Sequence, residues 1–281
     1  MDIMSSTDHT TTQSSIRGAG SGVLRFAGMV LILSALVGFL GQLLAIGQWR
    51  QVGYSFGLNR ISDLGLTTCG MVQDLFFPRY ACSPGYGWFN IGTIVSGVLL
   101  IIGALLLLTG LRRSPDRIRG GSAVAWLLLL SGAALIVTGA VPANVNAVLH
   151  DAAGVARAVL TWAAMALVWW AFRSWRRSGA EGPLPLVSGP AARATLVLLI
   201  VSVAGFLALV LAGLVEFAAG LVDRLTFDLL GLWTILLGTG LLGLPLTRAR
   251  EQQRTDERRQ LRRERAERDA AVRQAVEGLE Q

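Results

Sequence analysis

Six long apolar segments alternate with short polar ones along the 281-residue chain. A helix needs about 20 apolar residues to cross roughly 30 Å of hydrocarbon, and each segment meets this length. The pattern therefore predicts an all-α, polytopic membrane protein built as a six-transmembrane-helix bundle. The predicted spans are 24–48, 88–111, 122–142, 147–172, 194–215 and 228–247.

The segments at the two ends of the chain are polar. Residues 1–23 are rich in Ser and Thr and lack the apolar core of a cleavable signal, so we expect a disordered tail. Residues 248–281 hold ten Arg, eight acidic residues and no Pro, which predicts a charged helix. This helix could touch anionic lipid or bind a protein partner. The predicted domains are thus 1–23, 24–247 and 248–281, with a long outer loop at 49–87.

Composition and charge support a bilayer protein and give its orientation. Hydrophobic residues make up 53% of the chain and charged residues only 15%. The net charge of +7 does not indicate nucleic-acid binding, because the basic residues sit mainly beside apolar segments. Twenty of the 25 basic residues, all Arg, belong to the termini and the loops of one side. The positive-inside tendency predicts a multi-pass plasma-membrane protein with both termini in the cytoplasm.

The outer loop holds the only two cysteines of the chain, Cys69 and Cys82. Outside the cytoplasm a disulfide between them is expected, and two free buried thiols are the alternative. Closing so short a loop could contribute about 3 kcal/mol in the chain-entropy model.

The same loop contains the polar heptapeptide NRISDLG at 59–65. One interpretation is a short helical turn capped by Asn59 or Ser62 and ended by Gly65 in a left-handed conformation. This interpretation explains the Asn, Ser and Gly of the motif well and Asp63 less well. The other sets Ser62 and Asp63 against His150 in a polar pocket that could bind a lipid head group or move a proton.

A second polar stretch, VPANVNAVLHDAAGVAR, links the third and fourth spans on the same side. A helix that begins near Asn144 would carry Asn146, His150 and Arg157 on one face. Counted back from Arg173, about 20 residues of helix put Arg157 inside the hydrocarbon, with His150 just above it.

An Arg at this depth costs about 3 kcal/mol or more unless it finds a partner or snorkels to lipid phosphate. Asp63 is the preferred partner of Arg157, because nothing else explains the high density of polar residues in the loop that contains Asp63. Upward snorkelling of Arg157 is the alternative. Other carboxylates predicted near the outer side that could pair with Arg157 are Asp74, Asp151, Glu216, Asp223 and Asp228.

These stretches resemble a known family. NRISDLG, WFNIGTIVSG at the second span and VLHDAAG at the fourth are similar to the membrane proteins grouped as domain of unknown function 998, over about residues 24–247. More distantly they resemble the six-span Frag1/DRAM/Sfk1 group, which carries an Ile-Ser-Asp motif in its first non-cytoplasmic loop and includes members associated with lipid or lipid-anchor handling. The resemblance draws attention to Asn59, Ser62, Asp63, Asn90 and His150.

Missing motifs argue against several chemistries. With His9 and His150 as its only histidines, the chain lacks the paired ligands of a transmembrane haem and the ligand set of most catalytic zinc sites. It has no phosphate-loop motif either, so we expect no metal and no cofactor. A hydrolase can be drawn from Ser62 and His150 with Asp63 or Asp151, but no GxSxG elbow presents the serine. Coupled transport has weak support, because few charges lie near mid-membrane and no internal repeat is evident.

The predicted function is a non-enzymatic membrane component that binds, handles or organises lipid through a polar site at the outer face. The alternatives are a membrane-embedded hydrolase acting on a lipid or lipid anchor, and a small-solute or proton-linked transporter. In this hypothesis Asp63 neutralises Arg157 and His150 donates or accepts hydrogen bonds. Three asparagines, Asn59, Asn90 and Asn146, orient the bound group. The predicted site residues are Asn59, Ser62, Asp63, Asn90, Asn146, His150 and Arg157.

Overall fold

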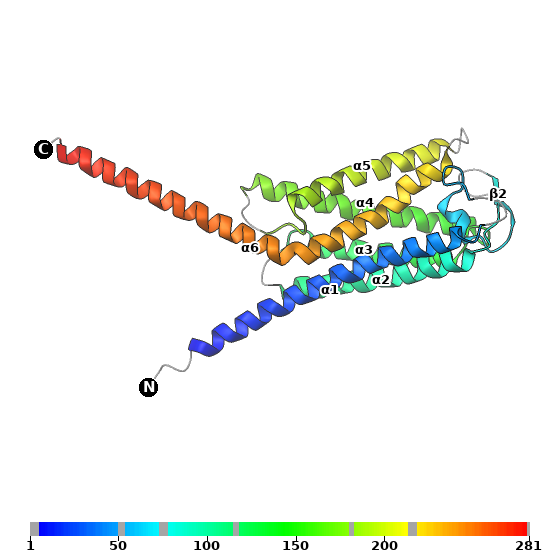
Figure 1. Cartoon of the computed structure of the whole chain (residues 1–281), viewed down its shortest axis with the longest axis horizontal. Coiled ribbons are helices and arrows are strands. Elements are labelled where there is room, and N and C mark those ends of the chain that lie inside the picture. The colour runs from blue at the N-terminus through cyan, green and yellow to red at the C-terminus, as the bar shows by residue number, and fades with distance from the viewer. Residues whose placement is uncertain are drawn as a thin grey trace. The chain divides into compact units, whose positions relative to one another are not determined.

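The computed structural model of the chain describes residues 6–49, 54–72, 78–114, 118–179, 183–212 and 218–279. Residues 1–242 form one compact unit, the helical bundle, and residues 243–281 form a second. Figure 1 shows the helices of the bundle lying side by side. The long helices are α1 (Ser6–Ile46), α2 (Tyr86–Arg113), α3 (Gly121–Ala140), α4 (Ala147–Arg177), α5 (Gly189–Ala212) and α6 (Ala219–Leu279).

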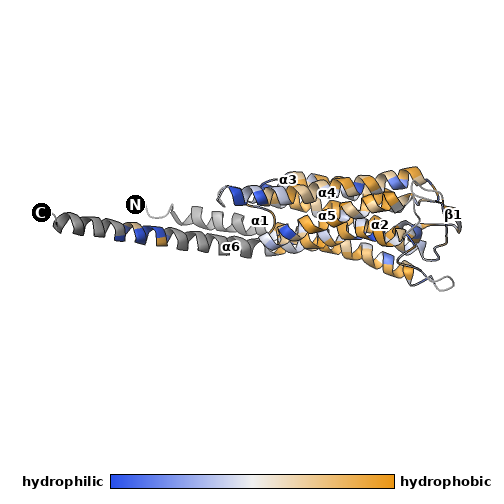
Figure 2. Cartoon of the chain, turned by 90° about the horizontal axis from the view of Figure 1, so that it is seen from above, coloured by the Kyte–Doolittle hydropathy of each residue, from blue (hydrophilic) through white to orange (hydrophobic). Residues whose placement is uncertain are grey.

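Six helical segments are long and apolar enough to cross a membrane, which confirms the predicted number of spans. They are Gly22–Ile46, Tyr86–Arg113, Gly121–Ala140, Ala147–Arg177, Gly189–Leu211 and Ala219–Gly243. Figure 2 shows apolar residues along the whole bundle. Large apolar side chains such as Leu40, Trp126 and Trp170 are about half exposed on its outside. Because water disfavours so large an apolar surface, the bundle is that of a multi-pass membrane protein.

The loop between α1 and α2 contains three small elements. The 3-10 helix η1 (Ile61–Gly65) is followed by strands β1 (Gly70–Val72) and β2 (Arg79–Ala81), which pair antiparallel with Met71 opposite Tyr80. The polar pattern predicted the turn but gave no sign of the hairpin. We call the end of the bundle that carries these elements and residues 141–146 the loop end.

Most span boundaries shift by a few residues from the prediction, and two differences have a clear physical cause. Helix α1 is helical from Ser6, within the segment for which we predicted disorder, because a helix extends from an existing span at the cost of one residue at a time. The sixth span begins at Ala219 rather than at 228. The prediction left Asp223 and Arg224 outside the span, but both are paired inside the bundle, which reduces the cost of a charge in hydrocarbon.

Glycines let neighbouring helices approach closely. A Cβ on Gly92 of α2 would lie 2.9 Å from the Gly41 Cα of α1, and a Cβ on Gly132 of α3 would lie 2.9 Å from the Gly97 carbonyl oxygen of α2. Small residues at such crossings are the usual means by which membrane helices pack. The three consecutive helices α1, α2 and α3 are therefore held at backbone-contact distance.

We expect Gly92→Ala to lower the thermal unfolding temperature in detergent, because the new methyl group must push α1 away. Overpacking of this kind costs about 1–3 kcal/mol. Gly87→Ala is the matched control, since a Cβ on Gly87 of the same helix has no atom within 4 Å. Equal unfolding temperatures for the two variants would contradict the close packing of α1 and α2.

Candidate functional site

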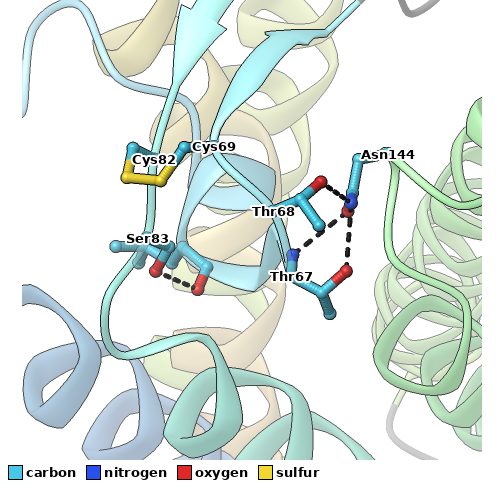
Figure 3. Close-up of a disulfide and its surroundings, with 7 residues drawn as sticks. Thr67, Thr68, Cys69, Cys82, Ser83 and Asn144 are labelled. Carbon is cyan, nitrogen blue, oxygen red and sulfur yellow. Dashed lines mark hydrogen bonds between the residues drawn. A yellow bond between two sulfur atoms is a disulfide. The ribbon is translucent and has the colours of Figure 1, made fainter.

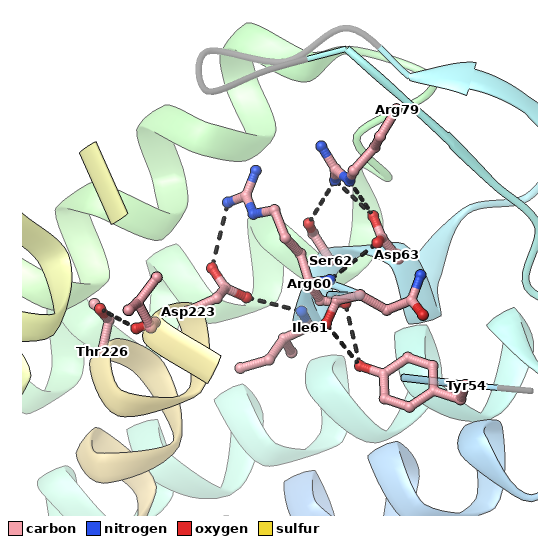
Figure 4. Close-up of polar contacts among 10 residues, drawn as sticks. Tyr54, Arg60, Ile61, Ser62, Asp63, Arg79, Asp223 and Thr226 are labelled. Carbon is pink, nitrogen blue, oxygen red and sulfur yellow. Dashed lines mark hydrogen bonds and ion pairs between the residues drawn. The ribbon is translucent and has the colours of Figure 1, made fainter. Parts of the chain in front are cut away.

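Asp63 is the centre of a buried polar cluster in η1 (Figure 4). Its side chain has no exposed surface. One carboxylate oxygen accepts a hydrogen bond from the Arg60 backbone N–H at 2.9 Å, and the other accepts from Arg79 Nε at 2.7 Å and contacts Arg79 Nη2 at 2.6 Å. Strand β2 holds Arg79, which also donates to Ser62 Oγ at 3.4 Å. The predicted pair of Asp63 with Arg157 is therefore wrong. Strand β2 of the hairpin supplies Arg79 as the partner of Asp63 instead.

Asp223 ties η1 to α6, although the two elements are far apart in the sequence. Its Oδ2 accepts from the Ile61 backbone N–H at 2.8 Å, and its Oδ1 lies 3.4 Å from Arg60 Nη2. A further backbone bond joins the N–H of Gly220 to the Gly57 carbonyl at 3.0 Å. The start of the sixth span thus fixes the position of the loop by both charge and backbone hydrogen bonds.

A second polar cluster lies next to the first and involves α1 and α6. Asp228 accepts from Gln42 Nε2 at 3.0 Å and from Arg224 Nη1 at 3.2 Å. Arg224 also donates to the Tyr54 hydroxyl, which in turn donates toward the carbonyl of Asn59 at 3.3 Å. Burial raises the pKa of Tyr54 above its ordinary value, against the opposing charge of Arg224. Tyr54 therefore remains a neutral donor.

The three predicted asparagines have local structural contacts. Asn59 Oδ1 accepts from the Ser55 backbone N–H at 3.0 Å, and Asn90 Nδ2 donates to the Gly65 carbonyl at 2.9 Å. Asn146 is the N-cap of α4, so it does not share the helical face of His150 and Arg157 as predicted. Cap residues have non-helical backbone angles, which the prediction overlooked by starting the helix near 144.

Gly65 also differs from the prediction. It does not adopt the left-handed conformation, which among the described glycines occurs at Gly120 and Gly179. A Cβ on Gly65 would instead lie 2.5 Å from Asn90 Oδ1 and 2.9 Å from the Phe89 ring. The glycine is therefore explained by the close contact between η1 and α2.

The predicted disulfide between Cys69 and Cys82 is confirmed (Figure 3). It joins the two arms of the hairpin just outside the strands. Beside it, Asn144 accepts from the Thr67 backbone N–H at 3.2 Å and donates to the Thr68 hydroxyl at 2.9 Å. The disulfide thus holds together the two arms of the hairpin that carries Arg79, and hydrogen bonds join this hairpin to the loop before α4.

Beneath η1 lies a cavity of about 110 Å³ inside the bundle. It is bounded by η1 and by helices α1, α2, α3, α4 and α6. This space holds several water molecules or one small polar group, and it is smaller than a typical drug-sized pocket of roughly 300–1,000 Å³. Its polar lining residues are Ser34, Gln42, Arg60, Ser62, Thr93, Ser96, Thr138, His150, Asp151, Arg157, Asp223, Asp228 and Thr234.

Three of the seven predicted site residues, Ser62, His150 and Arg157, line this cavity. The guanidinium of Arg157 makes no hydrogen bond or ion pair with any residue that the structure describes, and the charge that acts on it is that of Asp228. Arg157 therefore has a polar environment inside the bundle, and the charge that acts on it belongs to Asp228, which the sequence analysis named as a possible partner beside the preferred Asp63.

The hydrogen bond of His150 fixes which ring nitrogen faces a ligand. Its Nδ1 lies 2.8 Å from the carbonyl oxygen of Val141. A carbonyl oxygen only accepts, so Nδ1 carries the proton, and in the neutral ring Nε2 is left as an acceptor. Because His150 lines the cavity, a ligand hydroxyl there would find this acceptor.

The sequence analysis missed Gln42, Tyr54 and the role of Arg79. Gln42 had a usable signal, because it is an amide within the otherwise apolar run FLGQLLAIG. Asp223 and Asp228 were named as outer carboxylates; Asp228 was predicted as the first residue of the sixth span, but the place of Asp223 within that span was not expected. Asp74 and Glu216, which were named with them, lie outside the described residues.

Comparison with known proteins gives no relative: no family model, no curated protein and no solved structure matches this chain. The chemistry of the site therefore has to be argued from its own residues.

We expect Asp63→Asn to lower the thermal unfolding temperature markedly, because it leaves Arg79 without its carboxylate against a buried helix. Removing one partner of a buried ion pair costs about 3–5 kcal/mol. Glu267→Gln makes the same chemical change at an exposed position and should leave the temperature unchanged. If the Asp63→Asn variant unfolds at the same temperature as wild type, the polar cluster around Asp63 does not stabilise the loop.

Proposed function

We propose that this protein is a lipid-binding component of the membrane and that the cavity receives the polar head group. The observation that carries the proposal is a polar cavity inside an apolar bundle, with a guanidinium, Arg157, that no described residue pairs. Intramembrane charges are expensive and therefore mark functional positions by default. The head group of a lipid would supply a partner for the Arg157 guanidinium, while the acyl chains of that lipid remain in the bilayer.

The depth of Arg157 fits this role. Helix α4 has 31 residues and is therefore about 46 Å long, against roughly 30 Å of hydrocarbon. A centred helix extends about 8 Å beyond the hydrocarbon at each end. Arg157 is about 15 Å from the start of α4 and thus about 7 Å below the boundary at the loop end. Head groups lie outside the hydrocarbon, so a lipid phosphate meets Arg157 only where the head group enters the cavity from the loop end.

The packing below the cavity favours binding over transport. Past the level of Leu100 and Thr234, which line the cavity, the bundle continues as a mainly apolar core, in which buried hydroxyls such as Ser131 and Thr195 bond to neighbouring side chains. Side chains there are fully buried, namely Leu24, Leu31, Leu107, Leu128, Leu237 and Leu241. A transporter needs a second arrangement that opens this half, and the described residues give no polar path through it.

The hydrolase alternative has less support from the geometry. A serine nucleophile needs a base within hydrogen-bond reach. Within the described part of the chain, Ser62 Oγ accepts from Arg79, and no hydrogen bond joins it to His150. His150 is instead oriented by Val141, which is a backbone carbonyl rather than a carboxylate.

The remaining expectations belong to the same proposal. The excess of Arg on one side favours cytoplasmic termini, a plasma-membrane location and a loop end outside the cell, where a disulfide is stable. Residues 243–281 form a separate unit with an Arg-rich beginning, which suits anionic lipid or a protein partner. Membership of the family grouped as domain of unknown function 998 is proposed on the same footing.

The test is a substitution that fills the cavity and leaves its charged residues unchanged. Gly154 lines the cavity, and a Cβ built on it has no atom nearer than 4.0 Å. We expect wild type, purified in mild detergent, to retain lipid in native mass spectrometry. Gly154→Leu should lose most of it, because the new side chain occupies the head-group space, whereas Gly154→Ala should keep it.

Two results would contradict the proposal. One is folded wild-type protein that carries no lipid of any class. The other is Gly154→Leu protein that retains as much lipid as Gly154→Ala, which would put the lipid outside the cavity.

A further inference from the structure

The hydrogen-bond pattern of the cavity wall restricts the chemistry of the group that binds there. Three hydroxyls on the wall already donate to backbone carbonyls: Ser34 to Ser96 at 2.8 Å, Thr138 to Leu135 at 2.7 Å and Thr234 to Leu230 at 2.9 Å. A hydroxyl has one hydrogen, so these side chains have only acceptor capacity left for a ligand.

His150 adds to the same pattern. Its proton is used on the Val141 carbonyl, so the neutral ring offers Nε2 as an acceptor. One side chain from each of α1, α3, α4 and α6 thus presents an acceptor to the cavity. A ligand that satisfies these groups must itself donate hydrogen bonds, as hydroxyls do.

The unused donors of Arg157 favour an anion, although the wall also carries the carboxylates of Asp151, Asp223 and Asp228. Asp223 already accepts from the Ile61 N–H and pairs with Arg60, and Asp228 already accepts from Gln42 and Arg224. Each of these carboxylates therefore has a cation of its own, and Asp151, the third carboxylate of the wall, has an interaction as well. Arg157 offers five N–H donors, and none is used by a described residue. A phosphate matches this fork of donors better than a neutral group does.

We propose that the cavity selects a phosphate ester that carries free hydroxyls, with the phosphate on Arg157 and the hydroxyls on Ser34, Thr138, Thr234 and His150. The proposal rests on the proposed function and specifies its ligand. A phosphatidylglycerol-type head group has both features. A choline head group has no hydrogen-bond donor, and phosphatidic acid has no polyol. Each of them can therefore bind Arg157 through its phosphate but offers no polyol hydroxyls to the acceptors of the cavity wall. A free polyol phosphate shares the chemistry and is separated from the lipid by the experiment.

The experiment measures lipid selection in nanodiscs. Purified full-length protein is reconstituted in equal parts of phosphatidylglycerol, phosphatidic acid and phosphatidylcholine, and the lipids released with it are counted by native mass spectrometry. We expect wild type to retain phosphatidylglycerol most. Arg157→Gln should lose the preference for phosphatidylglycerol over phosphatidylcholine by about tenfold or more, the value of a charge-assisted hydrogen bond.

Matched variants separate charge from hydroxyl recognition. Arg157→Lys should keep a reduced anionic preference, and Arg173→Gln, at an exposed position of the same helix, should behave as wild type. Thr138→Val should narrow the preference for phosphatidylglycerol over phosphatidic acid and leave the preference for both over phosphatidylcholine. Added glycerol 3-phosphate identifies the source: displacement of the lipid assigns the site to the polyol phosphate alone, and no displacement assigns it to the intact lipid.

The inference is overturned if wild type retains phosphatidylcholine as well as phosphatidylglycerol, or if Arg157→Gln keeps the wild-type preference. Either result would leave the proposed function standing, provided that Gly154→Leu still removes the lipid. Loss of all lipid from wild type would instead end the proposed function itself.

Discussion

The bond between Asp223 and the loop is the constraint on which the rest of the structure depends. Its carboxylate accepts from the Ile61 backbone and pairs with Arg60, and so it joins the sixth span to η1. A charge in the bilayer has to be paired and hydrogen-bonded, since both desolvation and an unmet donor are costly there. Once η1 is fixed in this way, Asp63 binds Arg79 and the hairpin is held over the bundle.

The cavity follows from the same constraint. With η1 held over the loop end and the lower half of the bundle filled by leucines, a polar space is left between α1, α2, α3, α4 and α6. Asp223 and Asp228 pair with Arg60 and Arg224, and Asp151 has an interaction as well, whereas the Arg157 guanidinium has no hydrogen bond or ion pair with a described residue. A site that stabilises the fold through paired charges thereby leaves one charge for a ligand.

The membrane class and the six spans could be predicted from the sequence, because the length of an apolar segment is a property of the local sequence. Long-range pairing was not accessible in the same way. Arg79 and Asp63 meet only because a hairpin folds back over η1, and Asp223 enters the bundle only because Arg60 neutralises it. His150 and Arg157 were found from helical spacing, whereas Asn146 was misassigned because the helix starts three residues after the position we had expected.

The measurement that tests the central claim most directly is an electron cryomicroscopy structure of the protein in nanodiscs that contain phosphatidylglycerol. We predict density next to the Arg157 guanidinium that separates it from Asp228, continuous with a lipid at the loop end. A direct ion pair between Arg157 and Asp228, within about 4 Å and with no other density in the cavity, would contradict the account.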